Sequence, residues 1–178
     1  MLSGAVAWAD IDFTPHDSFY LAETTKVPCV AFRKGDDPVS YSPPFKWSLS
    51  GGGNQVTLTP AETPQAGAVM QTAPVRSNLI PATEENIKVY TDMAVRRLPR
   101  ESSKVTLVEA KIADLQFSGR KMVEVTLTYV AFAQPFTTNV LFLPYDKELI
   151  TFQMTARTPD FAPLARLFRA SLFSITGL

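Results

Sequence analysis

The chain has 178 residues, of which 46% are apolar and 19% charged, with 17 basic and 17 acidic side chains. This length and composition allow a globular domain with a substantial core and exclude wholesale disorder. The balanced charge excludes a global field that would attract nucleic acid or an anionic membrane surface. No stretch approaches the roughly 20 consecutive apolar residues of a membrane-spanning helix, so the sequence predicts no transmembrane segment.

The first nine residues have the pattern of an export signal. Residues 1–9 are small and apolar and finish with Ala7-Trp8-Ala9 ahead of Asp10. Signal peptidases cleave after such small-x-small patterns. We therefore interpret residues 1–9 as a remnant of a secretory signal and expect a periplasmic or secreted protein. A disordered or strand-like terminus in a cytoplasmic protein is the alternative.

Residues 10–40 are rich in chain-breaking residues. Pro15, Pro28 and Pro38 interrupt this stretch, and Gly35-Asp36-Asp37 has the composition of a turn. Proline lacks the N–H that a sheet ladder needs. We therefore expect an irregular N-terminal segment that wraps over a surface and contains one short strand, residues 28–33.

From residue 41 onward, alternating apolar and polar residues predict an antiparallel sheet. Residues 47–50 and 55–59 flank the glycine-rich turn 51–54, which is typical of a hairpin. Further strands are predicted over residues 68–72, 104–109, 112–117, 121–132, 136–143 and 149–155. Short turns between the later strands indicate an antiparallel meander.

Two amphipathic helices complete the predicted domain. The first has Thr83 as its expected N-cap and ends before Pro99; the second has Thr158 as its expected N-cap and Pro159 in its first turn. Their apolar stripes are Ile87, Tyr90, Ala94 and Leu98 in the first, and Phe161, Leu164, Ala165, Phe168 and Leu172 in the second. The element order predicts an α+β domain over residues 41–178, with helices packed on the sheet.

Reactive side chains are scarce. One histidine, His16, and one cysteine, Cys29, leave almost no material for a zinc or iron site or for a Cys–His dyad. Cys29 lies in an apolar run and is expected to be buried and structural. Glu109, Glu124 and Asp146 could serve only as paired carboxylates, and the simpler interpretation places them on a hydrated sheet face. We therefore predict no catalytic, metal or cofactor residues, no cofactor and no enzymatic activity.

Two groups of side chains are candidates for binding. Tyr41, Phe45 and Trp47 stand beside Pro43-Pro44 and could form a cleft for a small molecule or a peptide. The alternative is that Trp47 simply covers the end of the sheet. The cationic run 96–100 could hold an acidic partner or could only neutralise the end of the first helix.

The same elements resemble the PsbP-like superfamily. The pattern Tyr-x-Pro-Pro-x-x-Trp over residues 41–47 precedes the hairpin, the helix and the strand meander, and the chain closes with residues 149–156 and 168–172. That superfamily includes the photosystem extrinsic protein, the bacterial DcrB-like lipoproteins and a Ran-binding nuclear import factor. The resemblance covers roughly residues 41–176 and carries no catalytic motif.

The resemblance implies an α/β/α sandwich that is usually exported in bacteria and usually non-enzymatic. Such proteins act by binding another protein or a membrane complex, and they share no site whose residues could be carried over. The expected function is an exported, non-catalytic accessory or protein-interaction domain whose partner is another protein or an envelope complex. The alternative is a small-molecule or peptide binding module that uses an aromatic cleft near Phe45 and Trp47.

Overall fold

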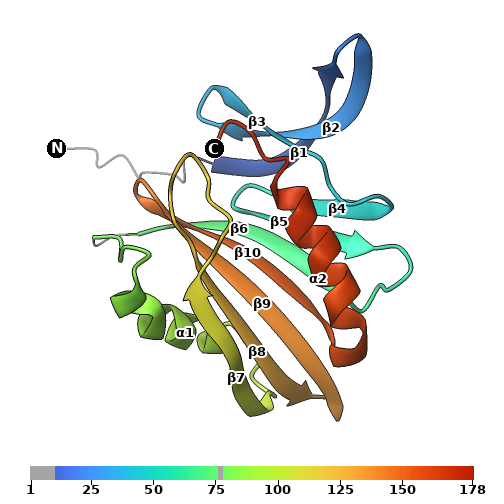
Figure 1. Cartoon of the computed structure of the whole chain (residues 1–178). Coiled ribbons are helices and arrows are strands. Elements are labelled where there is room, and N and C mark those ends of the chain that lie inside the picture. Colours follow the sequence, from blue (N-terminus) through green and yellow to red (C-terminus); the bar gives the residue numbers. More distant parts are fainter. Residues whose placement is uncertain (1–10, 76–77) are drawn as a thin grey trace, which may run out of the picture.

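The computed structural model describes residues 11–75 and 78–178, in which ten strands form two antiparallel sheets and two α-helices pack on the larger sheet (Figure 1). The expected signal remnant over residues 1–9 lies outside the described residues. None of the helices in the described part of the chain combines the length and apolar character that crossing a membrane requires.

The expectation of an irregular segment over residues 10–40 is wrong for the part that is described. Residues 11–41 form a three-stranded sheet of β1 (Ile11–Ala22), β2 (Thr25–Lys34) and β3 (Asp37–Tyr41). Its prolines lie where the ladder is irregular or where the strand has a neighbour on one side only. Pro15 lies at the register shift of β1, Pro38 lies in the edge strand β3, and Pro28 lies beyond the region where β3 pairs with β2.

The larger sheet has seven strands in the order β4-β5-β6-β10-β9-β8-β7. Their bounds are β4 Trp47–Gly52, β5 Gln55–Pro60, β6 Gly67–Pro74, β7 Ser103–Ile112, β8 Val123–Ala131, β9 Gln134–Tyr145 and β10 Glu148–Arg157. The predicted early hairpin is β4–β5, and the predicted meander is β7 to β10. β10 then pairs with β6, which joins the two halves of the sheet.

One predicted strand of the meander is absent. Residues 112–117 were expected to be a strand, but β7 ends at Ile112 and the following residues form a loop that turns back toward β8. The alternation that suggested a strand has another cause. Ala113, Leu115 and Phe117 are buried, because the loop inserts them into the core beneath α2.

The two helices cover opposite faces of the seven-stranded sheet. α1 (Ile87–Arg96) lies against β7 and β8, and α2 (Thr158–Leu172) lies against β9 and β10. Strand β9 shows the division, since Val140 and Phe142 pack in the core under α1 while Leu141 and Leu143 pack in the core under α2. The arrangement confirms the predicted α+β class and the α/β/α layering (Figure 1).

Both apolar stripes are confirmed, but of the two predicted N-caps only Thr83 occupies that position, and Thr158 does not. Thr83 is the N-cap of a 3₁₀ turn (Glu84–Asn86, η1) that leads directly into α1, but its hydroxyl makes no capping bond and accepts from the side chain of Asn86 instead. Thr158 is the first residue of α2, and its hydroxyl accepts from Thr137 in β9. Other side chains, one local and one from β9, therefore take the hydroxyl groups that the pattern assigned to capping bonds.

Asp12 ties the N-terminal sheet to the β4–β5 hairpin. Its Oδ1 accepts hydrogen bonds from the hydroxyl of Thr14 (2.6 Å), the backbone N–H of Thr14 (2.8 Å) and the backbone N–H of Gly53 (3.1 Å). Hydrogen bonds from Thr14, followed by the weaker one from Gly53, hold the pKa of Asp12 below its ordinary value of 3.8. The carboxylate form of Asp12 therefore stabilises the junction between the sheets.

We expect Asp12→Asn to lower the free energy of unfolding by about 1 kcal/mol near neutral pH, because asparagine keeps an acceptor but loses the charge. The folded pKa of Asp12 lies below the unfolded value of 3.8, so its contribution is complete above that value and is lost as the pH falls through the folded pKa. Urea unfolding between about pH 5 and pH 2 should show the difference between wild type and variant shrinking. A difference independent of pH would contradict this account.

Candidate functional site

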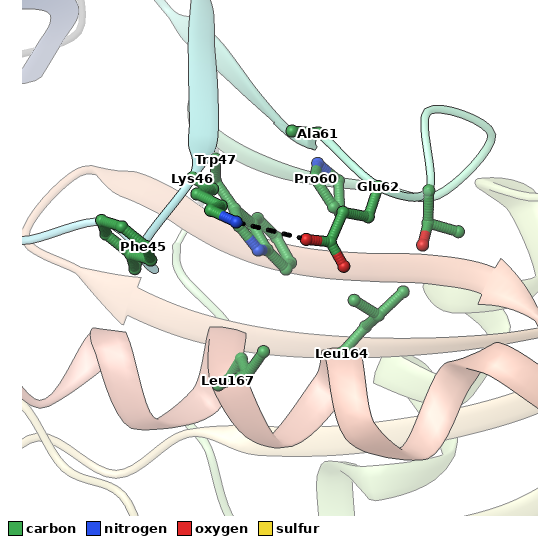
Figure 2. Close-up of a pocket in the computed structure, with 9 residues that line it drawn as sticks. Phe45, Lys46, Trp47, Pro60, Ala61, Glu62, Leu164 and Leu167 are labelled. Carbon is green, nitrogen blue, oxygen red and sulfur yellow. Dashed lines mark hydrogen bonds and ion pairs between the residues drawn. The ribbon is translucent and has the colours of Figure 1, made fainter.

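A cleft of about 340 Å³ lies between the start of β4, the loop after β5 and the side of α2 that faces them (Figure 2). Its lining comes from three separate parts of the chain: Phe45, Lys46, Trp47, Pro60, Ala61, Glu62, Thr63, Leu164 and Leu167. The composition is largely apolar, with one cation, one carboxylate and one hydroxyl. Such a lining suits binding through apolar contact better than chemistry on a substrate.

Trp47 is a fixed part of the cleft. Only 9% of the residue is exposed, and its ring is stacked almost parallel to Phe168 of α2, with ring centroids 6.3 Å apart and an interplanar angle of 4°. This contact fastens the edge strand β4 to the helix. Both interpretations from the sequence therefore apply to Trp47, because it covers the end of the sheet and also lines the cleft.

Phe45 and Leu167 form the exposed apolar part of the cleft. Phe45 is 88% exposed and Leu167 52% exposed, and Figure 2 shows both bordering the space in front of Trp47. The backbone of Lys46 is in the left-handed region (φ 62°), and the N–H of Trp47 donates to the carbonyl of Pro44 at 3.1 Å. This tight turn projects the phenyl ring of Phe45 away from the core, where it contributes no burial to folding.

A single ion pair crosses the cleft. Lys46 Nζ lies 3.4 Å from Glu62 Oε1, and both side chains are largely exposed. Exposed pairs of this kind contribute roughly 0–1 kcal/mol, so this one can separate at little cost. The pair can therefore rearrange when a ligand enters between Phe45 and the loop that carries Glu62.

Tyr41 does not take part in the cleft, although the sequence grouped it with Phe45 and Trp47. The residue is completely buried, and its hydroxyl is 2.8 Å from the hydroxyl of Ser171 in α2. Burial raises the pKa of Tyr41. Its role is to join β3 to α2, which is a structural function.

The other residues singled out from the sequence are dispersed. Cys29 is buried in β2 opposite Ser18, whereas His16 is opposite Ala31. The three acids are each paired with a separate cation: Glu109 with Lys111 at 3.0 Å, Glu124 with Arg169 at 2.7 Å and Asp146 with Arg120 at 2.7 Å. Within residues 11–75 and 78–178 there is no group of three or more His, Cys, Asp or Glu side chains that could hold a metal ion.

Sequence reasoning missed the half of the cleft that α2 supplies. Leu164 belongs to the predicted apolar stripe of the helix, and Leu167 lies off that stripe and was not singled out. A large apolar residue on the polar side of an amphipathic helix is a recognisable signal of a contact other than the core. The loop residues Pro60 and Glu62 carried no such signal.

Comparisons with known proteins identify the fold. No protein-family model matches the sequence, and no curated protein does. The solution structure of cyanobacterial PsbP from Synechocystis sp. PCC 6803 matches with a TM-score of 0.50 and 14% identity, over 99% of this chain and 97% of that chain. The fold is PsbP-like.

A second solved structure with this PsbP-like fold is similar to the chain. A protein of unknown function from Pseudomonas aeruginosa matches with a TM-score of 0.52 and 13% identity, over 92% of this chain and 98% of that one. At these identities the likeness establishes the PsbP-like fold alone. The resemblance noted in the sequence covered roughly residues 41–176. The structural match to cyanobacterial PsbP covers 99% of the chain and therefore extends beyond that range.

Proposed function

We propose that this chain is a non-catalytic protein-interaction domain that accommodates an apolar side chain of a partner protein in the cleft between Phe45 and Leu167. The proposal is carried by the exposure of Phe45, which stands 88% in solvent on a tight turn beside an apolar cleft. Burying such a side chain fully stabilises a complex by about 1.5–3 kcal/mol. A ring held outward by its backbone is already in place for binding.

The open shape of the cleft favours a peptide side chain over a free small molecule. Ligand sites of comparable volume enclose most of a small ligand, whereas this cleft leaves Phe45 and Leu167 exposed on its outer side. A peptide can cover these two side chains with its own backbone and flanking residues. A small-molecule binding module remains the second candidate, and the test below separates it from the first.

The proposed site of action is the periplasm or the outside of the cell, as part of an envelope complex. Support for this compartment comes from Ala7-Trp8-Ala9 in the N-terminal sequence. The binding proposal does not depend on it, because the cleft is built from residues 45–63 and α2.

The test is a titration of the ¹⁵N-labelled protein with short peptides that differ in one side chain. We expect a peptide with a central phenylalanine or leucine to shift the indole N–H resonance of Trp47, while the same peptide with a central aspartate does not. Phe45→Asp and Leu167→Asp should each weaken binding by roughly tenfold or more, which corresponds to losing about 1.4 kcal/mol of contact.

Matched controls come from exposed apolar residues elsewhere. Phe132, 76% exposed in the β8–β9 turn, controls for Phe45, and Val95, 41% exposed on α1, controls for Leu167. Aspartate at either control position should leave the affinity unchanged. Equal binding by the cleft variants and the wild type would refute the proposal, and binding of free indole without any peptide binding would favour the small-molecule alternative.

A further inference from the structure

The sheet face that carries α1 is only partly covered. α1 lies over β7 and β8, while no helix of the described chain lies over β4, β5 and β6 on that side. On this face the strand register pairs Gln71 of β6 with Thr151 of β10. It also pairs Val69 of β6 with Gln153 of β10 on one side and with Thr57 of β5 on the other. The uncovered area therefore presents the amides of Gln71 and Gln153 and the hydroxyl of Thr57 around the partly exposed Val69, with no charged group among them, and it lies on the side of the sheet opposite the Phe45 cleft.

Arg97 extends from the C-terminal end of α1 over this polar surface. Its Nη2 donates to Gln71 Oε1 at 2.6 Å and to Thr151 Oγ1 at 3.1 Å, and its Nε donates to Gln153 Oε1 at 3.2 Å. The cationic run of the sequence is therefore divided. Arg97 is half-buried and held by the sheet, whereas Arg96 is exposed.

The guanidinium group of Arg97 has a neutral environment. Among the described residues all three of its hydrogen-bond partners are uncharged, and no carboxylate forms an ion pair with it. Burial lowers the pKa of Arg97, but an arginine remains charged at physiological pH. Partly buried charges are usually paired, because an uncompensated one costs free energy.

The three bonds use two of the three guanidinium nitrogens. Nε and Nη2 donate to the sheet, while Nη1 has no partner among the described residues. Its two N–H groups are suited to the oxygen atoms of an anion, and they are fixed in orientation because the sheet holds the other side of the guanidinium plane. Arg97 is thus a pre-oriented donor with an unneutralised charge.

We propose that Arg97 binds the carboxylate of an aspartate or glutamate in an extended segment of a protein partner, with Gln71 and Thr57 providing hydrogen bonds to that segment. The charge of one carboxylate balances that of Arg97, which is the only cation that hydrogen-bonds to this face among the described residues. A phosphate dianion would call for further cations. The amide and hydroxyl groups of this face also match the donors and acceptors of a peptide backbone.

This second surface is independent of the Phe45 cleft, so each proposal can fail alone. The test uses the ¹⁵N-labelled full chain and three probes: the peptide Ac-Gly-Thr-Asp-Thr-Gly-NH₂, the same peptide with Asn in place of Asp, and inorganic phosphate. We expect the Asp peptide to shift the Nε–H resonance of Arg97 and the side-chain amide resonances of Gln71 and Gln153. Arg97→Gln should weaken binding of the Asp peptide by roughly tenfold, whereas Arg96→Gln should leave it unchanged.

Comparing the Asp and Asn peptides on the wild-type protein needs no variant, so the test holds even if Arg97→Gln fails to fold. Equal shifts with both peptides would overturn the proposal, and so would unchanged affinity in folded Arg97→Gln. Binding of inorganic phosphate without binding of the Asp peptide would also overturn it.

Discussion

Replacing Arg169 with alanine is expected to destabilise the protein by about 3 kcal/mol, because it leaves the carboxylate of Glu124 without its cation under α2. Glu124 Oε1 accepts from Arg169 Nη1 at 2.7 Å and from Asn139 Nδ2 at 2.9 Å. The Glu124 side chain is 11% exposed, and its Oε2 is buried with no partner among the described residues. Removing the arginine therefore leaves most of the desolvation cost of Glu124 uncompensated. Arg169 is itself 31% exposed, which keeps the expected value at the low end of the range for buried pairs.

The companion variants separate the loss of the pair from the loss of side-chain packing. Arg166→Ala, on an exposed position of the same helix, should change the free energy of unfolding by less than about 0.5 kcal/mol. Glu124→Gln removes the buried charge, so the double variant Glu124→Gln/Arg169→Ala should recover part of the stability lost in Arg169→Ala. Urea unfolding of the wild type and the four variants, Arg169→Ala, Arg166→Ala, Glu124→Gln and the double variant, measures these differences. If the double variant were less stable than Arg169→Ala alone, the unpaired charge of Glu124 would not be the cause of the stability loss in Arg169→Ala.

Trp47→Ala is expected to cost about 3 kcal/mol, since it opens a large cavity between β4 and α2. The indole is buried and stacked on Phe168, so its removal withdraws the main link between the edge of the sheet and the helix. Phe45→Ala, two residues earlier in the chain, should change the stability by less than about 0.5 kcal/mol because that ring is exposed.

Thermal and urea unfolding of both variants would check this contrast. The two aromatic residues line one cleft, yet one holds the fold and the other does not, so binding must be tested at Phe45 rather than at Trp47. A loss of stability in Phe45→Ala as large as in Trp47→Ala would show that the turn at Lys46 is part of the core.

Side-chain periodicity predicted the strands and helices that bury one face against a neighbouring layer. The alternation in β8 and the apolar stripe of α2 reflect burial against a neighbouring layer, and both are confirmed. The N-terminal sheet was missed because prolines were counted as breakers, although a strand tolerates proline where it has a neighbour on one side only. The loop after β7 was mistaken for a strand because Leu115 and Phe117 alternate with polar residues while packing into the core as a loop.

The cleft was predictable only in part. Phe45 and Trp47 are close in sequence, so their grouping could be recognised without knowing the fold. Leu164 and Leu167 join them only because β10 inserts beside β6 and brings α2 over that end of the sheet. The same limit applies to Arg97, whose partners Gln71 and Gln153 lie on strands that are distant in sequence and adjacent in the sheet. Long-range pairing of this kind has no local signal.

The most direct measurement is the position of a bound peptide on the protein. In a complex with a peptide that carries one central phenylalanine, we expect nuclear Overhauser effects between its ring protons and the methyl groups of Leu164 and Leu167. Contacts of that ring with residues outside the cleft, and none with these two leucines, would contradict the account.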